Sequence, residues 1–206
     1  MMKLIIFGAG GKTGRHMVAQ TLAAGHEVTA FVRSPEAFSL EHERLAVVKG
    51  NALNKKETEA AIKGHDAAAS CLGGKGLGKS SVLTEMTENI LSGMKKHSVN
   101  RILYVASAGI HQEIPGITGF LTQKVILKNV LRDHADAVRR IRESEFDWTV
   151  ARPMQLIDGP LTKNYRIAQE GIPEGGRKIA RADVAHFLVK AWIQKSFIHT
   201  SAGLAY

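Results

Sequence analysis

The sequence has little cysteine and no long hydrophobic run. Its 206 residues contain a single cysteine, Cys71, which has no cysteine partner for a disulfide or for a metal cage. We therefore expect a reducing compartment, the cytoplasm. The apolar stretch Leu4–Phe7 is far shorter than the roughly 20 residues of a membrane-spanning helix, and no hydrophobic segment precedes a secretory cleavage site. We expect neither membrane insertion nor export.

Aromatic residues are also scarce, at 6% of the chain, although the formal net charge is +9. A basic protein attracts nucleic acids whether or not it binds them specifically. Here the positive residues are scattered, and the densest groups, Lys95-Lys96 and Arg139-Arg140 with Arg142, have no interleaved aromatic residues. Such groups are typical of solvated helix faces. The histidines lack H-x-x-x-H or H-E-x-x-H spacing, so we expect neither a specific nucleic-acid partner nor a metal site.

Short apolar segments alternate with amphipathic ones, a pattern typical of parallel α/β sheets. We predict strands at 3–7, 27–32, 46–48, 66–72, 101–106 and 148–151, and helices from about Thr13, at 55–63, at 81–97, ending near Ser144, and at 182–194. We expect the strands to be buried on both faces. Only 153–179, with three prolines and four glycines, reads as a loop, which we interpret as an inserted substrate lobe. The prediction is one domain over residues 1–206, an α/β doubly wound Rossmann fold with a mostly parallel sheet and a small C-terminal substrate lobe.

The first predicted strand runs directly into a glycine-rich segment that precedes the first helix. Glycines in this context are informative for dinucleotide binding. Gly8 permits the tight turn, Gly11 lets the backbone approach a pyrophosphate, and Gly14 allows close helix packing. The helix N-terminus then presents N–H groups and its positive dipole end to the phosphates. The residues predicted to contact the cofactor here are Gly8, Gly10, Gly11, Lys12, Thr13 and Gly14.

The end of the second predicted strand carries no carboxylate, and its sequence is Phe31-Val32-Arg33-Ser34. An Asp or Glu at this point would bind the ribose hydroxyls of NAD. The planar guanidinium of Arg33 can instead pair with a 2′-phosphate, with help from the Ser34 hydroxyl and from Lys12. We therefore expect NADPH as the cofactor, with NADH less favoured. The alternative is that Arg33 is an ordinary surface arginine.

A second phosphate-binding pattern, G-x-x-x-x-G-K-[ST], is matched by residues 73–80, between a strand and a helix. Phosphoryl transfer also needs an acidic residue that holds Mg²⁺, whereas the later strands end in Ala106-Ser107 and Ala151-Arg152. We interpret the segment as a border of the dinucleotide site. A P-loop enzyme is the rival hypothesis for it.

The glycine spacing G-x-x-G-x-x-G resembles that of the short-chain dehydrogenase/reductase superfamily. With its later segments, the chain resembles atypical members: the flavin reductase/biliverdin-IXβ reductase group and the bacterial NAD(P)H-flavin reductase-like and NmrA-like proteins. Those segments are Val32-Arg33, Val48-Lys49-Gly50-Asn51, Leu72-Gly73, Ala106-Ser107-Ala108, Asp133-His134, Arg142-Glu143-Ser144, and Asp158-Gly159-Pro160-Leu161-Thr162 followed by Tyr165. The resemblance implies that Asn51 lies beside the adenine, where the family often has an aspartate, and that Ser107 lies close to the nicotinamide. It extends the predicted cofactor site to Asn51, Ala52, Leu72, Gly73, Gly74, Ala106, Ser107 and Pro153.

Classical members of that superfamily transfer a proton through a Tyr-x-x-x-Lys pair. Neither Tyr104 nor Tyr165 has a lysine four positions on, and Tyr206 is the last residue. The absence of this pair favours an acceptor that needs mainly a positioned hydride, such as a flavin, a quinone or a similar conjugated molecule.

Three residues are candidates for a polarising or proton-supplying role: Ser107, His134 and Gln155. Ser107 follows a strand, where it could equally cap a turn, whereas a histidine such as His134 is more often a helix-surface residue than a catalyst. By the resemblance, Gln155 stands where the flavin and biliverdin reductases carry a histidine, so a titratable group is missing.

The sequence as a whole predicts an NADPH-dependent reductase that acts on a small conjugated acceptor, as a monomer or small homo-oligomer. The alternative is a non-catalytic, NAD(P)-sensing protein of the NmrA-like kind, which would keep the dinucleotide loop without catalytic groups. The two hypotheses differ in whether the bound dinucleotide is turned over.

Overall fold

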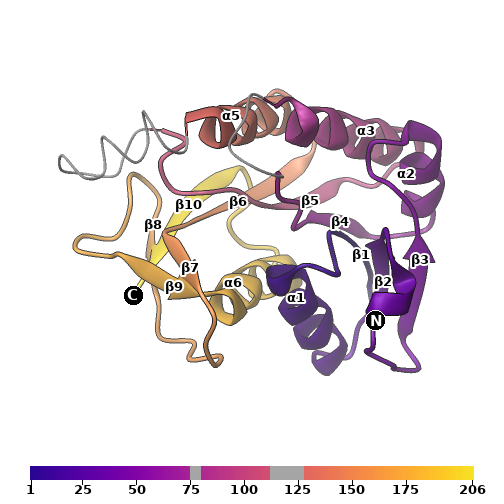
Figure 1. Ribbon diagram of the computed structural model, residues 1–206, viewed down its shortest axis with the longest axis horizontal. Coiled ribbons are helices and arrows are strands. Elements are labelled where there is room, and N and C mark those ends of the chain that lie inside the picture. The colour runs from indigo at the N-terminus through magenta and orange to yellow at the C-terminus, as the bar shows by residue number, and fades with distance from the viewer. Residues whose placement is uncertain (75–79, 112–127) are drawn as a thin grey trace.

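The computed structural model describes residues 1–74, 80–111 and 128–206, and these form alternating strands and helices (Figure 1). The strands are β1 (Lys3–Phe7), β2 (Glu27–Val32), β3 (Leu45–Lys49), β4 (Ala67–Ser70), β5 (Arg101–Val105), β6 (Asp147–Pro153), β7 (Gln155–Ile157), β8 (Arg166–Ala168), β9 (Lys178–Ala180) and β10 (Thr200–Ala205). The helices are α1 (Lys12–Ala23), the short 3₁₀ helix η1 (Pro35–Ala37), α2 (Lys55–Ile62), α3 (Val82–Lys96), α5 (Lys128–Arg142) and α6 (Arg181–Ile193). No helix within these ranges is long and apolar enough to cross a membrane.

The main sheet has the strand order β3-β2-β1-β4-β5-β6-β10-β8. Neighbouring strands are parallel except for the pair β10 and β8. From β1 the chain first builds outward to β3 and then returns to place β4 on the other side of β1. The strand order therefore reverses between β1 and β4, the point at which doubly wound sheets bind their ligands. The predicted fold class, a Rossmann-type α/β fold, is confirmed.

Helices cover both faces of the sheet, α1 and α6 on one and α2, α3 and α5 on the other (Figure 1). Side chains of β1 alternate between two apolar clusters. Leu4 and Ile6 pack with residues of α1 and α6, whereas Ile5 and Phe7 pack with residues of α2, α3 and α5. A strand with both faces covered must be apolar at every position, which explains the uninterrupted run Leu4–Phe7.

The helices α2 and α3 each begin at a side chain that lies outside the helix and binds the free N–H groups of its first turn. Asn54 caps α2, where its Oδ1 accepts from the backbone N–H groups of Lys56 and Glu57 at 3.1 and 3.3 Å. The carboxylate of Asp133, on α5, accepts from the N–H groups of Leu83 and Thr84 in the first turn of α3 at 3.1 and 3.0 Å. These bonds satisfy donors that have no partner within the helix.

Two features differ from the sequence-based expectations. The strands were expected to be buried on both faces, but β3 forms the edge of the sheet and leaves Val47 38% exposed. In addition, the segment 153–179, expected to be a loop, contains β7, β8 and β9, and β10 follows α6. Strands β7 and β9 pair in a small separate sheet, while β8 and β10 extend the main one. The strands β7, β8 and β9 have three residues each and are too short to give a periodic pattern, so they were missed. The six-residue strand β10 was also missed.

Candidate functional site

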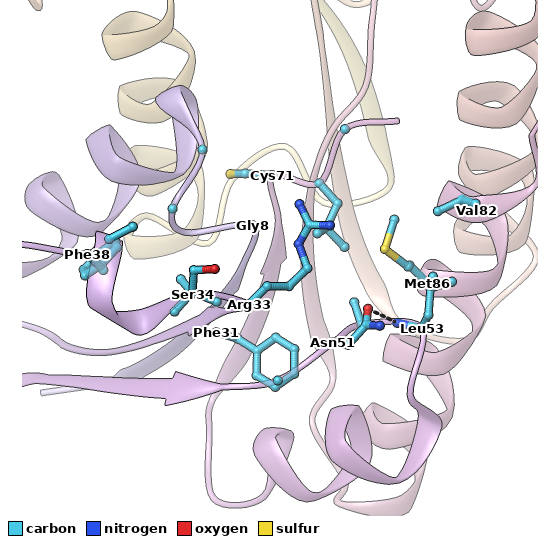
Figure 2. A pocket seen from close by; sticks show the side chains of 18 of the residues that line it. Gly8, Phe31, Arg33, Ser34, Phe38, Asn51, Leu53, Cys71, Val82 and Met86 are labelled. Atoms are coloured by element: carbon cyan, nitrogen blue, oxygen red, sulfur yellow. Dashed lines mark hydrogen bonds between the residues drawn. The ribbon is translucent and has the colours of Figure 1, made fainter. Parts of the chain in front are cut away.

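A cavity of about 630 Å³ lies where the strand order reverses, at the carboxyl ends of β1, β2 and β4 (Figure 2). Its size is typical of a pocket for a cofactor or a comparable small molecule. Its walls come from the glycine loop, the ends of β2, β3 and β4, and the start of α3. The lining residues are Gly8, Gly10, Gly11, Arg15, Phe31, Val32, Arg33, Ser34, Ala37, Phe38, Gly50, Asn51, Ala52, Leu53, Cys71, Leu72, Gly73, Ser80, Val82 and Met86.

The glycine loop is held tightly against the sheet, and two of its glycines leave no room for a side chain. Gly8 has a φ of +75°, and a Cβ there would lie 2.8 Å from the carbonyl carbon of Cys71. A Cβ on Gly14 would overlap the carbonyl oxygen of Gly8, and the N–H of Gly11 donates to that same oxygen at 3.0 Å. The glycines thus let β1 turn sharply into α1 beside the end of β4.

The N-terminus of α1 lies at the cavity, where Gly10 and Gly11 form part of the lining. Gly11 is the N-cap residue, with φ −71° and ψ 164°, and as a glycine it has no side chain that could cap the helix. Its first-turn N–H groups are therefore satisfied by neither the helix nor a capping side chain, and the positive end of the dipole faces the loop. An anionic group beside Gly10 and Gly11 would complete this end of the helix.

The six glycine-loop residues that were predicted to contact the cofactor do not all lie at the cavity. Gly8, Gly10 and Gly11 line the cavity, whereas Thr13 and Gly14 are buried beneath the loop. Lys12 does not line the cavity, and its Nζ donates to Asp158 Oδ2 at 2.7 Å.

Lys12 takes part in an ion-pair triad that joins the glycine loop to the segment after β7. Asp158 also accepts from Arg181 Nη1 at 2.7 Å, at the start of α6. The hydrogen bond from Lys12 and the charge of Arg181 hold the pKa of the Asp158 carboxyl below its usual range. In this arrangement the ammonium group of Lys12 pairs with Asp158, and the predicted help of Lys12 at a 2′-phosphate stays a prediction.

Arg33 and Ser34 lie at the end of β2 and both line the cavity. Figure 2 shows the Arg33 side chain extending across the hollow, between the side of Gly8 and Cys71 and the side of Met86. Within residues 1–74, 80–111 and 128–206, no hydrogen bond or ion pair of the Arg33 guanidinium is found. An exposed arginine that points into a cavity is available to an anionic ligand.

The opposite wall is formed by the turn after β3. The Oδ1 of Asn51 accepts from the N–H of Leu53 at 3.1 Å (Figure 2), and the N–H of Asn51 donates to Glu57 Oε2 at 2.8 Å. These bonds set the turn and hold Ala52 and Leu53 at the cavity wall. Gly50 is required because a Cβ there would collide with the ring of Phe31.

Several lining residues were not predicted, and Arg15 is the most polar of them. Its Nε donates to the carbonyl of Gly10 at 3.1 Å and its Nη2 to the carbonyl of Ala37 at 2.6 Å. The guanidinium carbon lies 5.2 Å from the centre of the Phe38 ring. The sequence places Arg15 next to the last glycine, but only the fold brings Ala37 and Phe38 beside it.

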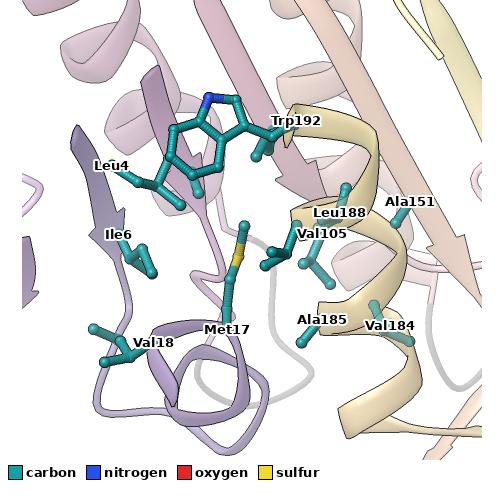
Figure 3. Packing of buried hydrophobic residues seen from close by; sticks show 14 of the residues in the cluster. Leu4, Ile6, Met17, Val18, Val105, Ala151, Val184, Ala185, Leu188 and Trp192 are labelled. Carbon is teal, nitrogen blue, oxygen red and sulfur yellow. The ribbon is translucent and has the colours of Figure 1, made fainter. Parts of the chain in front are cut away.

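Cys71 lines the cavity from the end of β4 and contacts the core beneath it. Its Sγ lies 3.7 Å from the Sδ of Met17, which packs against Ile6, Val105 and Leu188 (Figure 3). Burial raises the pKa of the Cys71 thiol to about 12, so the group is a thiol at neutral pH. Cys71 therefore supports the cavity floor as an apolar residue.

The remaining residues of the predicted cofactor site fall into two groups, those that line this cavity and those that do not. Asn51, Ala52, Leu72 and Gly73 line it, whereas Gly74, Ala106, Ser107 and Pro153 do not. The last three lie at the ends of β5 and β6, where Pro153 accepts the N–H of Ala108 at 2.9 Å. Of the P-loop match at 73–80, residues 75–79 lie outside the described ranges. Its two end residues, Gly73 and Ser80, both border the cavity.

None of the three catalytic candidates lines the described cavity. Ser107 is half-buried, and its hydroxyl donates to the carbonyl of Ala108 at 3.1 Å. Gln155 lies on β7 with its side chain exposed. In the described part of the chain, no group of three His, Cys, Asp or Glu side chains is arranged to hold a metal ion.

His134 is a buried residue rather than a surface one. It is 7% exposed, and its Nδ1 lies 3.2 Å from the hydroxyl of Tyr104 on β5. Burial lowers the pKa of His134 to about 4, against a smaller opposing effect of Asp133. Its spacing from Leu131, three residues away, places both on the inward face of α5, so the helical period could have revealed this.

Comparison with known proteins adds a sequence family and a set of similar folds. A family model described as NAD(P)H-binding matches residues 8–195. The uncharacterized protein YwnB of Bacillus subtilis is 25% identical over 194 residues, which make up 89% of each chain. A short-chain dehydrogenase/reductase of Veillonella parvula in complex with NADP is 20% identical, with a TM-score of 0.84, over 100% of this chain and 94% of that one. ChuY, an anaerobillin reductase from Escherichia coli O157:H7, is 22% identical, with a TM-score of 0.83, over 98% and 96%.

Proposed function

The chain belongs to the NAD(P)H-binding family, and on this premise we propose that it is an NADPH-dependent reductase for a flavin, quinone or similar conjugated acceptor. The observation that carries the proposal is the cavity at the strand-order reversal, with an open helix N-terminus on one side and, inside it, Arg33, for which no partner is found among the described residues. These groups suit a dinucleotide that carries a phosphate on its adenosine ribose.

The cavity offers each part of such a cofactor a fitting surface. Gly10 and Gly11 would hold the pyrophosphate, since backbone N–H groups are accessible where no side chain intervenes. Leu53, Val82 and Met86 form an apolar wall suited to the adenine. When bound, NADPH would supply the hydride. The Veillonella parvula neighbour, which is in complex with NADP, supports the choice of cofactor.

We propose that Arg33 and Ser34 select NADPH over NADH. The proposal is supported by their position at the end of β2, with no carboxylate beside them in the sequence Phe31-Val32-Arg33-Ser34. Replacing Arg33 by alanine should weaken NADPH binding roughly 10- to 100-fold, the value of one or two charge-assisted hydrogen bonds. NADH binding should change less than about threefold, because NADH has no phosphate at that position.

Titration of nicotinamide fluorescence with the purified variants measures both affinities. Arg132→Ala is the matched control, because Arg132 is an exposed arginine on α5 whose side chain is 78% exposed. It should leave both cofactors unaffected. Equal losses of NADPH and NADH in Arg33→Ala would refute the role in 2′-phosphate binding.

The tyrosines support a reaction that needs no activated phenol. A partner lysine in classical enzymes lowers a tyrosine pKa, whereas here burial raises the pKa of Tyr104, raises that of Tyr165 to about 12, and raises that of Tyr206. Each hydroxyl also has a protein partner: His134, His186 and Asp183, respectively. A conjugated acceptor needs chiefly a hydride placed close to it, which this chain can provide by orientation alone.

The test is to mix the purified protein with NADPH and either FMN, riboflavin or a soluble quinone, and to follow the loss of nicotinamide absorbance. We expect oxidation above the protein-free rate, and a slower reaction with NADH. No oxidation with any flavin would eliminate flavins as acceptors, and no oxidation with any member of the panel would eliminate the reductase proposal.

A second candidate function is NAD(P) sensing without turnover. It is favoured by one observation, that Ser107, His134 and Gln155 all lie away from the described cavity wall. A sensor would show a thermal shift with NADPH in the same preparation that oxidises none. In either case we propose that the segment 153–179 forms the surface that a substrate or partner molecule contacts, because Asp158 ties it to the glycine loop.

A further inference from the structure

Two arginines, not one, line the part of the cavity beside Ser34 and Phe38. Arg33 enters from the end of β2 and Arg15 from the first turn of α1, and both line the cavity with Ser34 and Phe38. Neither forms an ion pair with a carboxylate within residues 1–74, 80–111 and 128–206. Two unneutralised positive charges at one end of a pocket attract a doubly charged anion more strongly than one does.

Arg15 differs from Arg33 in being fixed before any ligand arrives. Its Nε and Nη2 donate to the carbonyls of Gly10 and Ala37, so the guanidinium bridges the glycine loop and η1. The ring of Phe38, itself 8% exposed, lies against the guanidinium. Two bonds to fixed backbone atoms and a packed ring leave the side chain little freedom to lose on binding.

One edge of this fixed guanidinium is left for a ligand. The two carbonyl bonds use Nε and Nη2, and no hydrogen bond of Nη1 is found in the part of the chain that the structure describes. Gly10 keeps the neighbouring space open, since a Cβ there would meet only the Cγ1 of Val32, at 3.7 Å. The open space therefore lies between Arg15, the glycine loop and the end of β2.

We propose that Arg15 is a specificity-determining residue that binds the 2′-phosphate of the cofactor together with Arg33. Arg15 is already held in place before the phosphate binds. Arg33, which has no protein partner in the described ranges, moves to bind the phosphate from the other side. Lys12, which follows Gly11, is left out of the proposal because it does not line the cavity and its Nζ pairs with Asp158 at 2.7 Å. The inference rests on the proposed preference for NADPH, and extends it to a residue that holds the phosphate from the glycine-loop side.

The experiment compares two non-redox ligands that differ only in the 2′-phosphate, adenosine 2′,5′-bisphosphate and adenosine 5′-monophosphate, by calorimetric titration of the full chain. Arg15→Gln should lose about 10- to 100-fold in affinity for the bisphosphate, and less than about threefold for the monophosphate. Arg15→Lys, which keeps the charge but not the fork, should lose an intermediate amount for the bisphosphate alone. Arg132→Gln serves as the surface control and should match the wild type.

Each result bears on one statement. If Arg15→Gln weakens both ligands by the same factor, Arg15 only supports the glycine loop. If it weakens neither, Arg15 does not contact the phosphate. Either result would overturn the inference and leave the reductase proposal intact. If Arg15→Gln does not fold, as judged by circular dichroism, the same ratio measured in Arg15→Lys decides the matter. A wild-type protein that binds both ligands equally would instead refute the NADPH preference itself.

Discussion

Replacing His134 by glutamine should flatten the acid side of the protein's stability profile. His134 is 7% exposed, and burial lowers its pKa to about 4 in the folded protein, from an ordinary value of 6.5. Between these two pH values the unfolded chain binds a proton that the folded chain does not. The free energy of unfolding must therefore fall as the pH is lowered from about 6.5 to about 4, and this contribution is fully present only above pH 6.5.

The size of the effect follows from the same two values. Each tenfold change in proton affinity is worth about 1.4 kcal/mol, so the full loss is about 3 kcal/mol at and below pH 4. That is a large part of the 5–15 kcal/mol by which domains are typically stable. The lowered pKa also matters for function, because His134 is uncharged at neutral pH and so lacks the acidic imidazolium proton that a general acid would supply.

Urea unfolding followed by circular dichroism at pH 7 and at pH 4.5 measures the effect. Glutamine keeps a hydrogen-bonding group beside Tyr104 but does not titrate, so the difference between wild type and His134→Gln should shift by roughly 2–2.5 kcal/mol in favour of the variant at pH 4.5, where most of the full loss has occurred. Tyr104→Phe is the control, since it removes the hydroxyl at 3.2 Å and leaves His134 to titrate. A difference between wild type and His134→Gln that is the same at both pH values would refute the burial argument.

Two further predictions concern packing around the site. Gly14→Ala should destabilise the protein by roughly 1–3 kcal/mol, because the new Cβ would overlap the carbonyl oxygen of Gly8. Gly10→Ala, whose Cβ would meet only Val32 at 3.7 Å, should melt as the wild type does, and equal melting temperatures for both variants would contradict this. Asp183→Asn should cost roughly 3 kcal/mol, because this fully buried carboxylate accepts four hydrogen bonds from Thr162, Lys163 and Tyr206. Unchanged resistance of the segment 153–179 to limited proteolysis in that variant would count against its role in anchoring the segment.

The parts of the site that the sequence could predict are those built from neighbouring residues. The glycine loop is one, because Gly8, Gly11 and Gly14 act on a turn that they themselves form. The position of Arg33 is another, since it follows directly from where β2 ends. The partners of these residues could not be predicted, because Cys71 meets Gly8 only when β4 pairs with β1.

The sequence by itself determined the fold class, the glycine loop at the cavity and the position of an arginine at the end of β2, because alternating apolar segments and glycine spacing are local signals. Only the tertiary structure decided which basic residues face the cavity. Lys12 pairs with Asp158, 146 positions away, and so leaves the cavity, while η1 gives Arg15 its second carbonyl. The physical reason is that a charged side chain goes to its best partner in space, and distance along the chain does not show which partner that is.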